Sequence, residues 1–427
     1  MQITQDDNNA PNIILITIDA LRIDAFSTWS GCLSEPLFMD EFAKNAIVFE
    51  NHYSVATSTL MNLYSMYTGL HPRQQPIRSL GKATIPVHNI QNLGGILHSH
   101  GYDLWTNMDE HLGSPNIYPF SELSRNYRKE PIYQHFSSPV FPHTFPGMPS
   151  YYLYAIAETA VPFALERYRE NNTKSFTHLW LQDLHVLHRH PNFYKEANLT
   201  EPSAQSNIGS PIVNRYFDIV KHIDKYIEQF LTEVYEINDN VLVIINADHG
   251  EALGEYPAEK NDAEWFSTDG RQYDHGYPNQ IENNLIHTPC IMKPPRWNKG
   301  VRLKQLVSVN DLYDTICSYL SDPCINYKYS WKHLVECDKP HQHRFVIADT
   351  RWWTELDRAS CLITDDGFKL IQYSNKKFKL FDLNNDPKEE YNLLTGSEEK
   401  NNPMVKLYKR LEKASYKYLR NKSVWSL

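Results

Sequence analysis

The dipeptide Asp248-His249 is the leading candidate for chemistry in the sequence, because it closely follows the β-branched apolar run VLVII at 241–245. A carboxylate beside an imidazole is a mixed oxygen and nitrogen ligand pair that suits Zn²⁺, Mn²⁺ or a similar ion. Gly250 then allows the backbone to turn away sharply. A second carboxylate from another strand end would complete a charge-neutralising site, and Asp19 is placed to supply it. A structural or capping role is the alternative for these acidic residues.

The hydroxyl residues Thr57, Ser58 and Thr59 precede a helix-like segment at 61–67, which ends at Thr68-Gly69. A hydroxyl at a helix N-terminus usually caps the helix, and we expect that role for Thr57 and Ser58. Beside a metal ion the same position has a second use. A cation can ionise the hydroxyl while the helix N-terminus holds an anionic oxygen of a substrate. The residues alone leave both uses open.

Two more apolar runs lead to an acidic residue, as the run before Asp248 does. They are NIILITI at 12–18, followed by Asp19, and HLWL at 178–181, which leads to Asp183. Such runs are typical of strands that are buried on both faces of a parallel sheet. Because ligands gather beyond the carboxyl ends of these strands, we expect the acidic strand ends to form one site.

The segment between the second and third runs predicts how these strands are connected. Apolar residues recur over 212–234 at three- and four-residue steps, the period of an amphipathic helix. A helix at this place is the crossover of a βαβ unit. The sequence therefore predicts an α/β fold with a large, mostly parallel sheet flanked by helices.

The second half of the chain predicts a separate small subdomain. After about residue 340, short strands surround a DDG turn at 365–367, which indicates an antiparallel hairpin, and a helix over 404–418 closes the chain. We expect a catalytic α/β domain at 1–340 and a C-terminal antiparallel α+β subdomain at 341–427. A proline- and aromatic-rich stretch at 111–150 is predicted to form a long loop over the site.

Composition excludes several classes of protein. Lys and Arg number 42 against 51 Asp and Glu, a net charge of −9, which argues against a nucleic-acid partner. The apolar run at 13–18 is far too short to span a membrane, and Asp6 and Asp7 do not suit a signal peptide, so the chain is predicted to be cytoplasmic or truncated. Six scattered cysteines without a CxxC pair do not indicate a disulfide scaffold or a zinc ribbon.

Several segments occur in a fixed order along the chain, and three of them contain the residues described above. These three read NIILITIDALRIDAF at 12–26, SVATSTLMNLYSMYTGLHP at 54–72 and NADHGEALGE at 246–255. Together they resemble the alkaline phosphatase superfamily, and specifically its sulfatase-like hydrolase branch. Further segments are similar to the same family, so the resemblance covers roughly 12–394; they are GYDLWTN at 101–107, WLQDLH at 180–185, YFDIVKHIDKYI at 216–227 and FKLFDLNNDPKEEYNL at 378–393.

The resemblance implies a metal centre and a nucleophile. Asp19 falls on the family's N-terminal metal carboxylate, and Asp248 and His249 fall on its second pair of metal ligands. Thr59 falls on the nucleophile. In the family, this side chain attacks phosphorus or sulfur in line, forms a covalent ester and binds the metal as it does so.

The resemblance also implies residues that contact the substrate. His185 matches a substrate-contacting histidine, and His275 lies where the family has a cationic residue that helps the leaving group. Both are therefore predicted to be catalytic and substrate-binding. Asn107 is predicted to bind the substrate as well.

The chain departs from true sulfatases at the nucleophile. Those enzymes convert a Cys or Ser within Cys/Ser-x-Pro-x-Arg into formylglycine, whereas the corresponding run here is TLMNL at 59–63. A hydrated aldehyde can expel sulfate by collapsing, but a threonine ester must be cleaved by water or by an acceptor hydroxyl. The sequence therefore favours phosphoryl chemistry over sulfuryl chemistry.

The predicted metal ligands depart from the sulfatase pattern too. Ala20 stands where many sulfatases have a second acidic ligand, and His249 stands where they often have Asn. Two carboxylates, a hydroxyl and one imidazole resemble the sites of the family's Mn²⁺- or Zn²⁺-using phosphodiesterases and phosphotransferases rather than its calcium-binding arylsulfatases. We expect one divalent ion, Mn²⁺ or Zn²⁺ before Mg²⁺ or Ca²⁺. A second ion held by Asp183, His188 and His275 is the alternative.

These expectations describe a metal-dependent hydrolase of phosphate or phosphonate mono- or diesters that acts through a covalent Thr59 intermediate. Its substrate would be a small-molecule or glycan-linked ester. One alternative is a transferase that moves a phosphoryl-linked head group onto a glycan, and another is a sulfatase that acts without formylglycine. A binding protein built on a decayed hydrolase fold is disfavoured, because every expected type of ligand is present.

Overall fold

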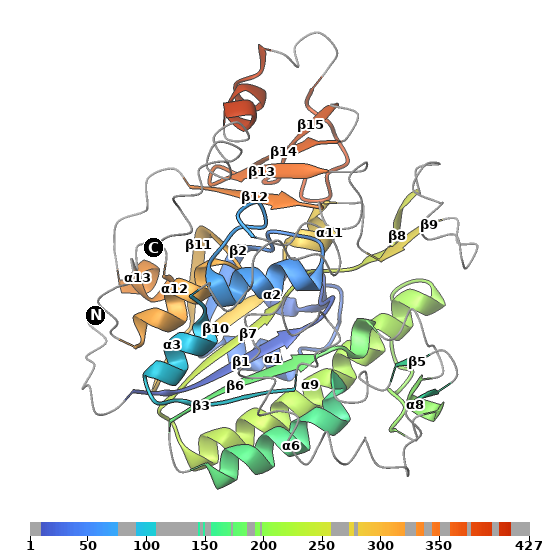
Figure 1. The fold of residues 1–427 in the computed structure, drawn as a ribbon. Coiled ribbons are helices and arrows are strands. Elements are labelled where there is room, and N and C mark those ends of the chain that lie inside the picture. The colour runs from blue at the N-terminus through green and yellow to red at the C-terminus, as the bar shows by residue number, and fades with distance from the viewer. Residues whose placement is uncertain are drawn as a thin grey trace.

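A central sheet between two layers of helices, with a smaller sheet beyond one end, makes up the fold in the computed structural model (Figure 1). The α/β fold expected from the sequence is confirmed. The structure describes residues 10–75, 91–107, 144–145, 148–149, 155–171, 174–185, 193–196, 199–257, 273–276, 281–320, 330–336, 344–350, 359–373, 377–394 and 401–410.

The central sheet has seven strands in the order β11-β2-β10-β7-β1-β6-β3. Most neighbours are parallel, as expected, but β10 runs antiparallel to both β2 and β7. The strands are β1 (Asn12–Ile18), β2 (Ile47–Tyr53), β3 (Asp103–Thr106), β6 (Ser175–Leu181), β7 (Val241–Ala247), β10 (Cys290–Lys293) and β11 (Val301–Ser308).

Alternate residues of β1 and β7 face two separate apolar cores, because side chains along a strand point in turn to opposite faces. Ile14 and Ile16 pack in one core with α1 (Phe38–Ala43), α6 (Ala157–Glu170) and α9 (Pro211–Ile237). Ile13 and Leu15 pack in the other with α2 (Thr59–Thr68), α3 (Leu93–Ser99) and α12 (Asp311–Ser318). The sheet is therefore buried on both faces, as its apolar strands predict.

The helix α9 is the crossover that the apolar period over 212–234 predicts. It leads into β7, packs beside α6, and buries Ile219, Ile223 and Ile227 against the sheet. Pro211 occupies its first position, where a missing N–H breaks no hydrogen bond. No helix in the described ranges is both long and apolar enough to cross a membrane.

The smaller sheet contains β12 (Phe345–Asp349), β13 (Ser360–Thr364), β14 (Phe368–Gln372) and β15 (Phe378–Asp382), all antiparallel. The predicted hairpin at 365–367 joins β13 to β14, and Gly367 has the positive φ of 88° that this turn requires. Residues 403–410 are helical, and the rest of the helix predicted at 404–418 lies outside the described residues. The expected antiparallel hairpin is confirmed, whereas the boundary at 340 stays a prediction.

The loop predicted at 111–150 lies outside the described residues, apart from β4 (Thr144–Phe145) and β5 (Met148–Pro149). The remaining short elements are the 3₁₀ helices η1 (Ile23–Ala25) and η2 (Ser27–Trp29), the strands β8 (Ala252–Pro257) and β9 (Tyr273–Gly276), and the helices α8 (Phe193–Glu196), α11 (Asn283–Ile286) and α13 (Trp331–Glu336).

Candidate active site

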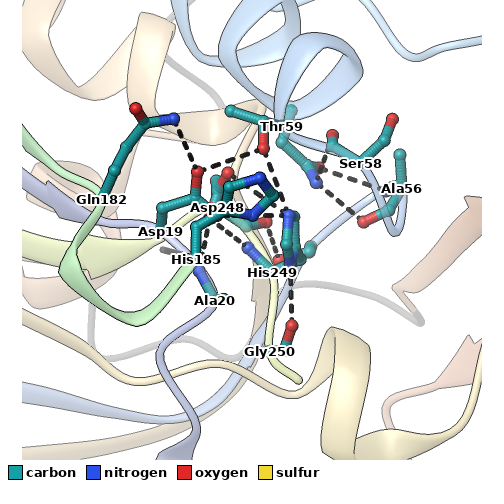
Figure 2. A network of polar contacts seen from close by, with 12 residues as sticks. Asp19, Ala20, Ala56, Ser58, Thr59, Gln182, His185, Asp248, His249 and Gly250 are labelled. Carbon is teal, nitrogen blue, oxygen red and sulfur yellow. Dashed lines mark hydrogen bonds and ion pairs between the residues drawn. The ribbon is translucent and has the colours of Figure 1, made fainter. Parts of the chain in front are cut away.

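The register of three parallel strands brings the site together. Ile18 of β1 pairs with Leu181 of β6 and with Ala247 of β7. The next residue along each strand is therefore at the same level of the sheet. These residues are Asp19, Gln182 and Asp248, and they lie at the carboxyl ends of the strands (Figure 2).

Three side chains form a cluster that fits a metal ion. Asp19, Asp248 and His249 are all buried, and one ligand atom from each lies within 4.8 Å of the others. His249 Nε2 lies 3.5 Å from Asp19 Oδ1 and 3.6 Å from Asp248 Oδ2. Ligands about 2.1 Å from a tetrahedral ion would be roughly 3.4 Å apart, so these distances suit a divalent cation.

Asp248 is oriented by two backbone donors. Its Oδ1 accepts hydrogen bonds from the N–H of Ala20 at 3.2 Å and from the N–H of His249 at 2.8 Å. Its Oδ2 is buried and has no hydrogen-bond partner within the described part of the chain. A buried carboxylate oxygen without a donor is costly, and coordination of a cation would satisfy it.

His249 presents its Nε2 to the cluster because its other ring nitrogen is used. Nδ1 lies 2.7 Å from the carbonyl oxygen of Gly250, which can only accept, so Nδ1 carries the hydrogen. Burial by itself lowers the pKa of His249, but the carboxylates of Asp248 and Asp19 outweigh it and the net shift is upward. The two carboxylates thus favour a positive charge at this place.

The backbone of α11 passes so close to position 250 that a glycine is required there. A Cβ atom at this position would lie 2.0 Å from the carbonyl oxygen of Asn284, at α11. The N–H of Gly250 also donates to the carbonyl oxygen of Leu285 at 2.7 Å. The turn after His249 is therefore held closely against α11. A sharp turn of the backbone at Gly250 is what the sequence predicts.

Thr59 begins α2 and points its hydroxyl at the cluster (Figure 2). Its Oγ1 lies 3.2 Å from His249 Nε2 and 3.5 Å from Asp19 Oδ2. The capping role expected of Thr57 and Ser58 is not what the structure has. Ser58 occupies the N-cap position, but its side chain makes no capping hydrogen bond, and Thr57 lies one residue before it.

Buried hydrogen bonds hold α2 on the sheet. Burial lowers the pKa of His178 in β6 to about 3, so its ring is neutral. Tyr67 of α2 lies 2.7 Å from His178 Nδ1, and Thr17 of β1 lies 3.0 Å from its Nε2. Thr17 in turn donates to the side-chain oxygen of Asn246 at 2.9 Å. The helix that begins with Thr59 and the strands that lead to Asp19 and Asp248 thus share one hydrogen-bonded chain.

His185 and Gln182 approach Asp19 from the segment after β6, in which residues 183–185 are helical. His185 Nδ1 lies 4.0 Å from Asp19 Oδ1, and Gln182 Nε2 donates to Asp19 Oδ2 at 3.3 Å. Gln182 is absent from the residues predicted from the sequence, because the acidic Asp183 beside it is the expected site residue of this strand end. Its only signal was its position directly after the strand.

Asp183 does not join the cluster, which corrects the expectation that all the acidic strand ends form one site. Its Oδ2 accepts from the N–H of Ala157 at 3.0 Å, and its Oδ1 accepts from the hydroxyl of Tyr194 at 2.8 Å. Gln182, the first residue after β6, lies at the level of Asp19 and reaches it, whereas Asp183 is already helical and faces Ala157 and Tyr194. The alternative of a second ion would need Asp183 in a different arrangement, and the side chain of His188 lies outside the described residues.

The two other predicted substrate residues have different surroundings. Asn107 is buried, and its side-chain amide both donates to and accepts from the backbone of Trp180, each at 2.7 Å, which prolongs the pairing of β3 with β6. His275 lies in β9, opposite Leu253 of β8, and its side chain is outside the described part. The substrate-binding roles of both residues stay predictions.

Comparisons with known proteins identify the family and the fold of the chain. A family model described as Sulfatase matches residues 11–322. Among solved structures, a 2-O GAG sulfatase superposes with a TM-score of 0.69 at 15% identity, over 98% of this chain and 94% of that one. A phosphonate monoester hydrolase of Agrobacterium radiobacter gives 0.64 at 15% identity, over 96% of each chain. Another, from Silicibacter pomeroyi, gives 0.64 at 16% identity, over 95% of each. No curated protein sequence matches the chain.

Proposed function

Because the chain belongs to the sulfatase family, within the alkaline phosphatase superfamily, we propose that it is a metal-dependent hydrolase of phosphate or phosphonate esters with Thr59 as its nucleophile. One observation carries the proposal. The Thr59 hydroxyl lies 3.2 Å from His249 Nε2 and 3.5 Å from Asp19 Oδ2, so it meets the candidate metal ligands at one point. A threonine with a purely structural role at the start of a helix would not have to place its hydroxyl beside the candidate metal ligands.

The ligand set supports a transition metal. Two carboxylates and one imidazole favour Mn²⁺ or Zn²⁺ over Ca²⁺, which prefers six to eight oxygen ligands. A divalent cation held by Asp19, Asp248 and His249 would supply the positive charge that lowers the pKa of the Thr59 hydroxyl and withdraws charge from a phosphoryl oxygen.

The proposed reaction has two displacement steps. Thr59 Oγ1, its proton passing to solvent, attacks phosphorus in line while the bond to the leaving oxygen breaks on the opposite side. His185 and His275 are proposed to protonate the leaving oxygen or to stabilise its charge. Water then attacks the phosphorus, the bond between phosphorus and Oγ1 breaks, and Thr59 regains a proton.

Two considerations support phosphoryl over sulfuryl esters. The chain has TLMNL at 59–63 and thus no Cys or Ser at the nucleophile position that could be converted to formylglycine. Phosphonate monoester hydrolases are among the structural neighbours. The 2-O GAG sulfatase supports the competing possibility of a glycan-linked sulfate ester. We therefore propose a small-molecule or glycan-linked phosphate or phosphonate ester as the substrate.

The test compares native protein, Thr59→Ala and Thr59→Ser on aryl phosphate mono- and diesters, aryl phosphonates and aryl sulfates. We expect Thr59→Ala to keep its metal content, measured by elemental analysis, but to lose turnover, and Thr59→Ser to retain part of it. Mass spectrometry of acid-quenched native protein should detect a phosphoryl or phosphonyl adduct on the peptide that contains Thr59.

Other results would select a different function. Turnover by Thr59→Ala at the native rate would refute the nucleophile. Sulfate release from aryl sulfates alone would support a sulfatase without formylglycine. If product forms only when a sugar acceptor is added, the protein is a transferase.

A further inference from the structure

Asn62, in the first turn of α2, makes four hydrogen bonds to the loop that precedes the helix. Its side-chain oxygen accepts from the N–H groups of Val55 and Ala56, each at 3.1 Å. Its side-chain nitrogen donates to the carbonyl oxygens of Ala56 at 2.7 Å and Ser58 at 3.2 Å. Asn62 has no exposed surface, so this amide is used fully and only for the loop.

Two more hydrogen bonds hold the N-terminal end of the loop at 55–58. Ser54, just before it, donates its hydroxyl to the carbonyl oxygen of Asp248 at 2.5 Å. The carbonyl oxygen of Val55 accepts from the N–H of Asp349, the last residue of β12, at 3.1 Å. The loop therefore connects the candidate metal ligand Asp248 with the start of the nucleophile helix, and Asn62 is the side chain that closes this connection.

The start of α2 lacks two features that could hold it in place, a side-chain cap and the proline and arginine of the sulfatase motif. Ser58 makes no capping hydrogen bond with its side chain. Neither proline nor arginine occurs in the run TLMNL at 59–63, where the sulfatase motif contains both. Since an unsupported first turn frays, another group must hold Thr59 in place.

We propose that Asn62 is the positioning residue of Thr59, through the backbone of residues 55–58. The inference rests on the proposed role of Thr59 as nucleophile. Asn62 does not touch the metal ligands in any hydrogen bond of the described residues, so it acts on the place of the Thr59 oxygen and not on metal binding. A displacement of about 1 Å at a reacting atom can lower a rate about 100-fold.

The experiment compares Asn62→Ala with Gln75→Ala. Gln75 is also a fully buried amide that contacts α2, but it donates to Met61, Ser65 and the carbonyl oxygen of Leu70 instead of the loop at 55–58. We expect both variants to lose thermal stability and to keep native metal affinity. Only Asn62→Ala should lose kcat, by about 100-fold, with KM changed by less than about threefold.

A second variant covers the case in which Asn62→Ala does not fold. In Asn62→Asp the side chain keeps the oxygen that accepts from Val55 and Ala56, but a second carboxylate oxygen replaces the amide nitrogen. That oxygen repels the carbonyl oxygens of Ala56 and Ser58, to which the nitrogen donated. Protonation of the new carboxyl group at low pH restores one donor. The ratio of its kcat to that of the native protein should therefore rise as pH falls, whereas Gln75→Glu should show no such rise.

Three outcomes overturn the inference. They are native kcat in the Asn62 variants, an equal loss of kcat in the Asn62 and Gln75 variants, and a kcat ratio of Asn62→Asp that is independent of pH. If Thr59→Ala is inactive in the same assays, the proposed function still stands. If Thr59→Ala is active, the proposed function has failed, and the inference fails with it.

Discussion

Arg73 and Asp349 form a buried two-point ion pair between the segment after α2 and the last residue of β12. Arg73 Nε lies 2.7 Å from Asp349 Oδ2, and one terminal nitrogen lies 2.9 Å from Oδ1. The two side chains are 2% and 0% exposed. The pair therefore fixes the smaller sheet beside the helix that begins with Thr59.

Asp349→Asn is expected to reduce the free energy of unfolding by about 3–5 kcal/mol, because it leaves the Arg73 guanidinium buried without its counter-charge. Urea denaturation followed by circular dichroism measures the change. Glu50→Gln is the matched control, since Glu50 pairs with Arg302 at the surface, where the side chains are 24% and 49% exposed. A surface pair contributes about 0–1 kcal/mol, so equal losses in the two variants would contradict the role of burial.

Gln182→Ala is expected to weaken metal binding about 10- to 100-fold, because its amide nitrogen donates to the candidate metal ligand Asp19 and so orients it. Competition with a chromophoric chelator gives the dissociation constant. Gln229→Ala, which removes an exposed amide of α9, should leave that constant unchanged. Native affinity in Gln182→Ala would mean that Asp19 is held in place without this donor.

Gly250→Ala is expected to lower stability by about 1–3 kcal/mol and to weaken metal binding, because the new methyl group would meet the carbonyl oxygen of Asn284 at 2.0 Å. Relief of that contact must shift the turn that carries His249. Gly95→Ala in α3 is the control, since within 4 Å its methyl group would meet only the side-chain oxygen of Asn92 among the described residues, at 3.8 Å. Thermal unfolding should show no loss for Gly95→Ala, and similar losses in both variants would argue against a steric cause.

Asp183 should make stability depend on pH. Burial raises the pKa of this carboxyl to about 7, although hydrogen bonds from Tyr194 and Ala157 oppose the shift. A group whose pKa is higher in the folded than in the unfolded state binds its proton on folding. Its contribution to stability is thus complete below about pH 4 and is lost as pH rises through 7.

Asp183→Asn is therefore expected to flatten the decline of stability between pH 5 and 8, because an amide can serve both partners without ionising. Urea midpoints at several pH values measure the slope. Asp239→Asn, which changes a carboxylate whose side chain is 68% exposed, should keep the native slope. An unchanged slope in Asp183→Asn would show that this carboxyl does not titrate in the range.

Local pattern in the sequence was enough to predict the elements that carry the site. The apolar runs of β1, β6 and β7, the helical period of α9 and the turn between β13 and β14 are all visible within about 25 residues. Residue type and position also selected Asp19, Asp248 and His249, and the family resemblance selected Thr59; the fold brings these four residues together. Such features depend on neighbours along the chain, and a single sequence contains them.

Only the tertiary structure decided which side chains face each other. The register of β6 against β1 places Gln182 beside Asp19 and turns Asp183 toward Tyr194, although Asp183 is the more conspicuous residue in the sequence. The reversed direction of β10, between β2 and β7, left no local signal either. Strand pairing joins residues that lie far apart in the sequence, and the backbone hydrogen bonds look alike in every register. The packing of side chains on the two faces of the sheet selects one register, and that packing exists only in the folded chain.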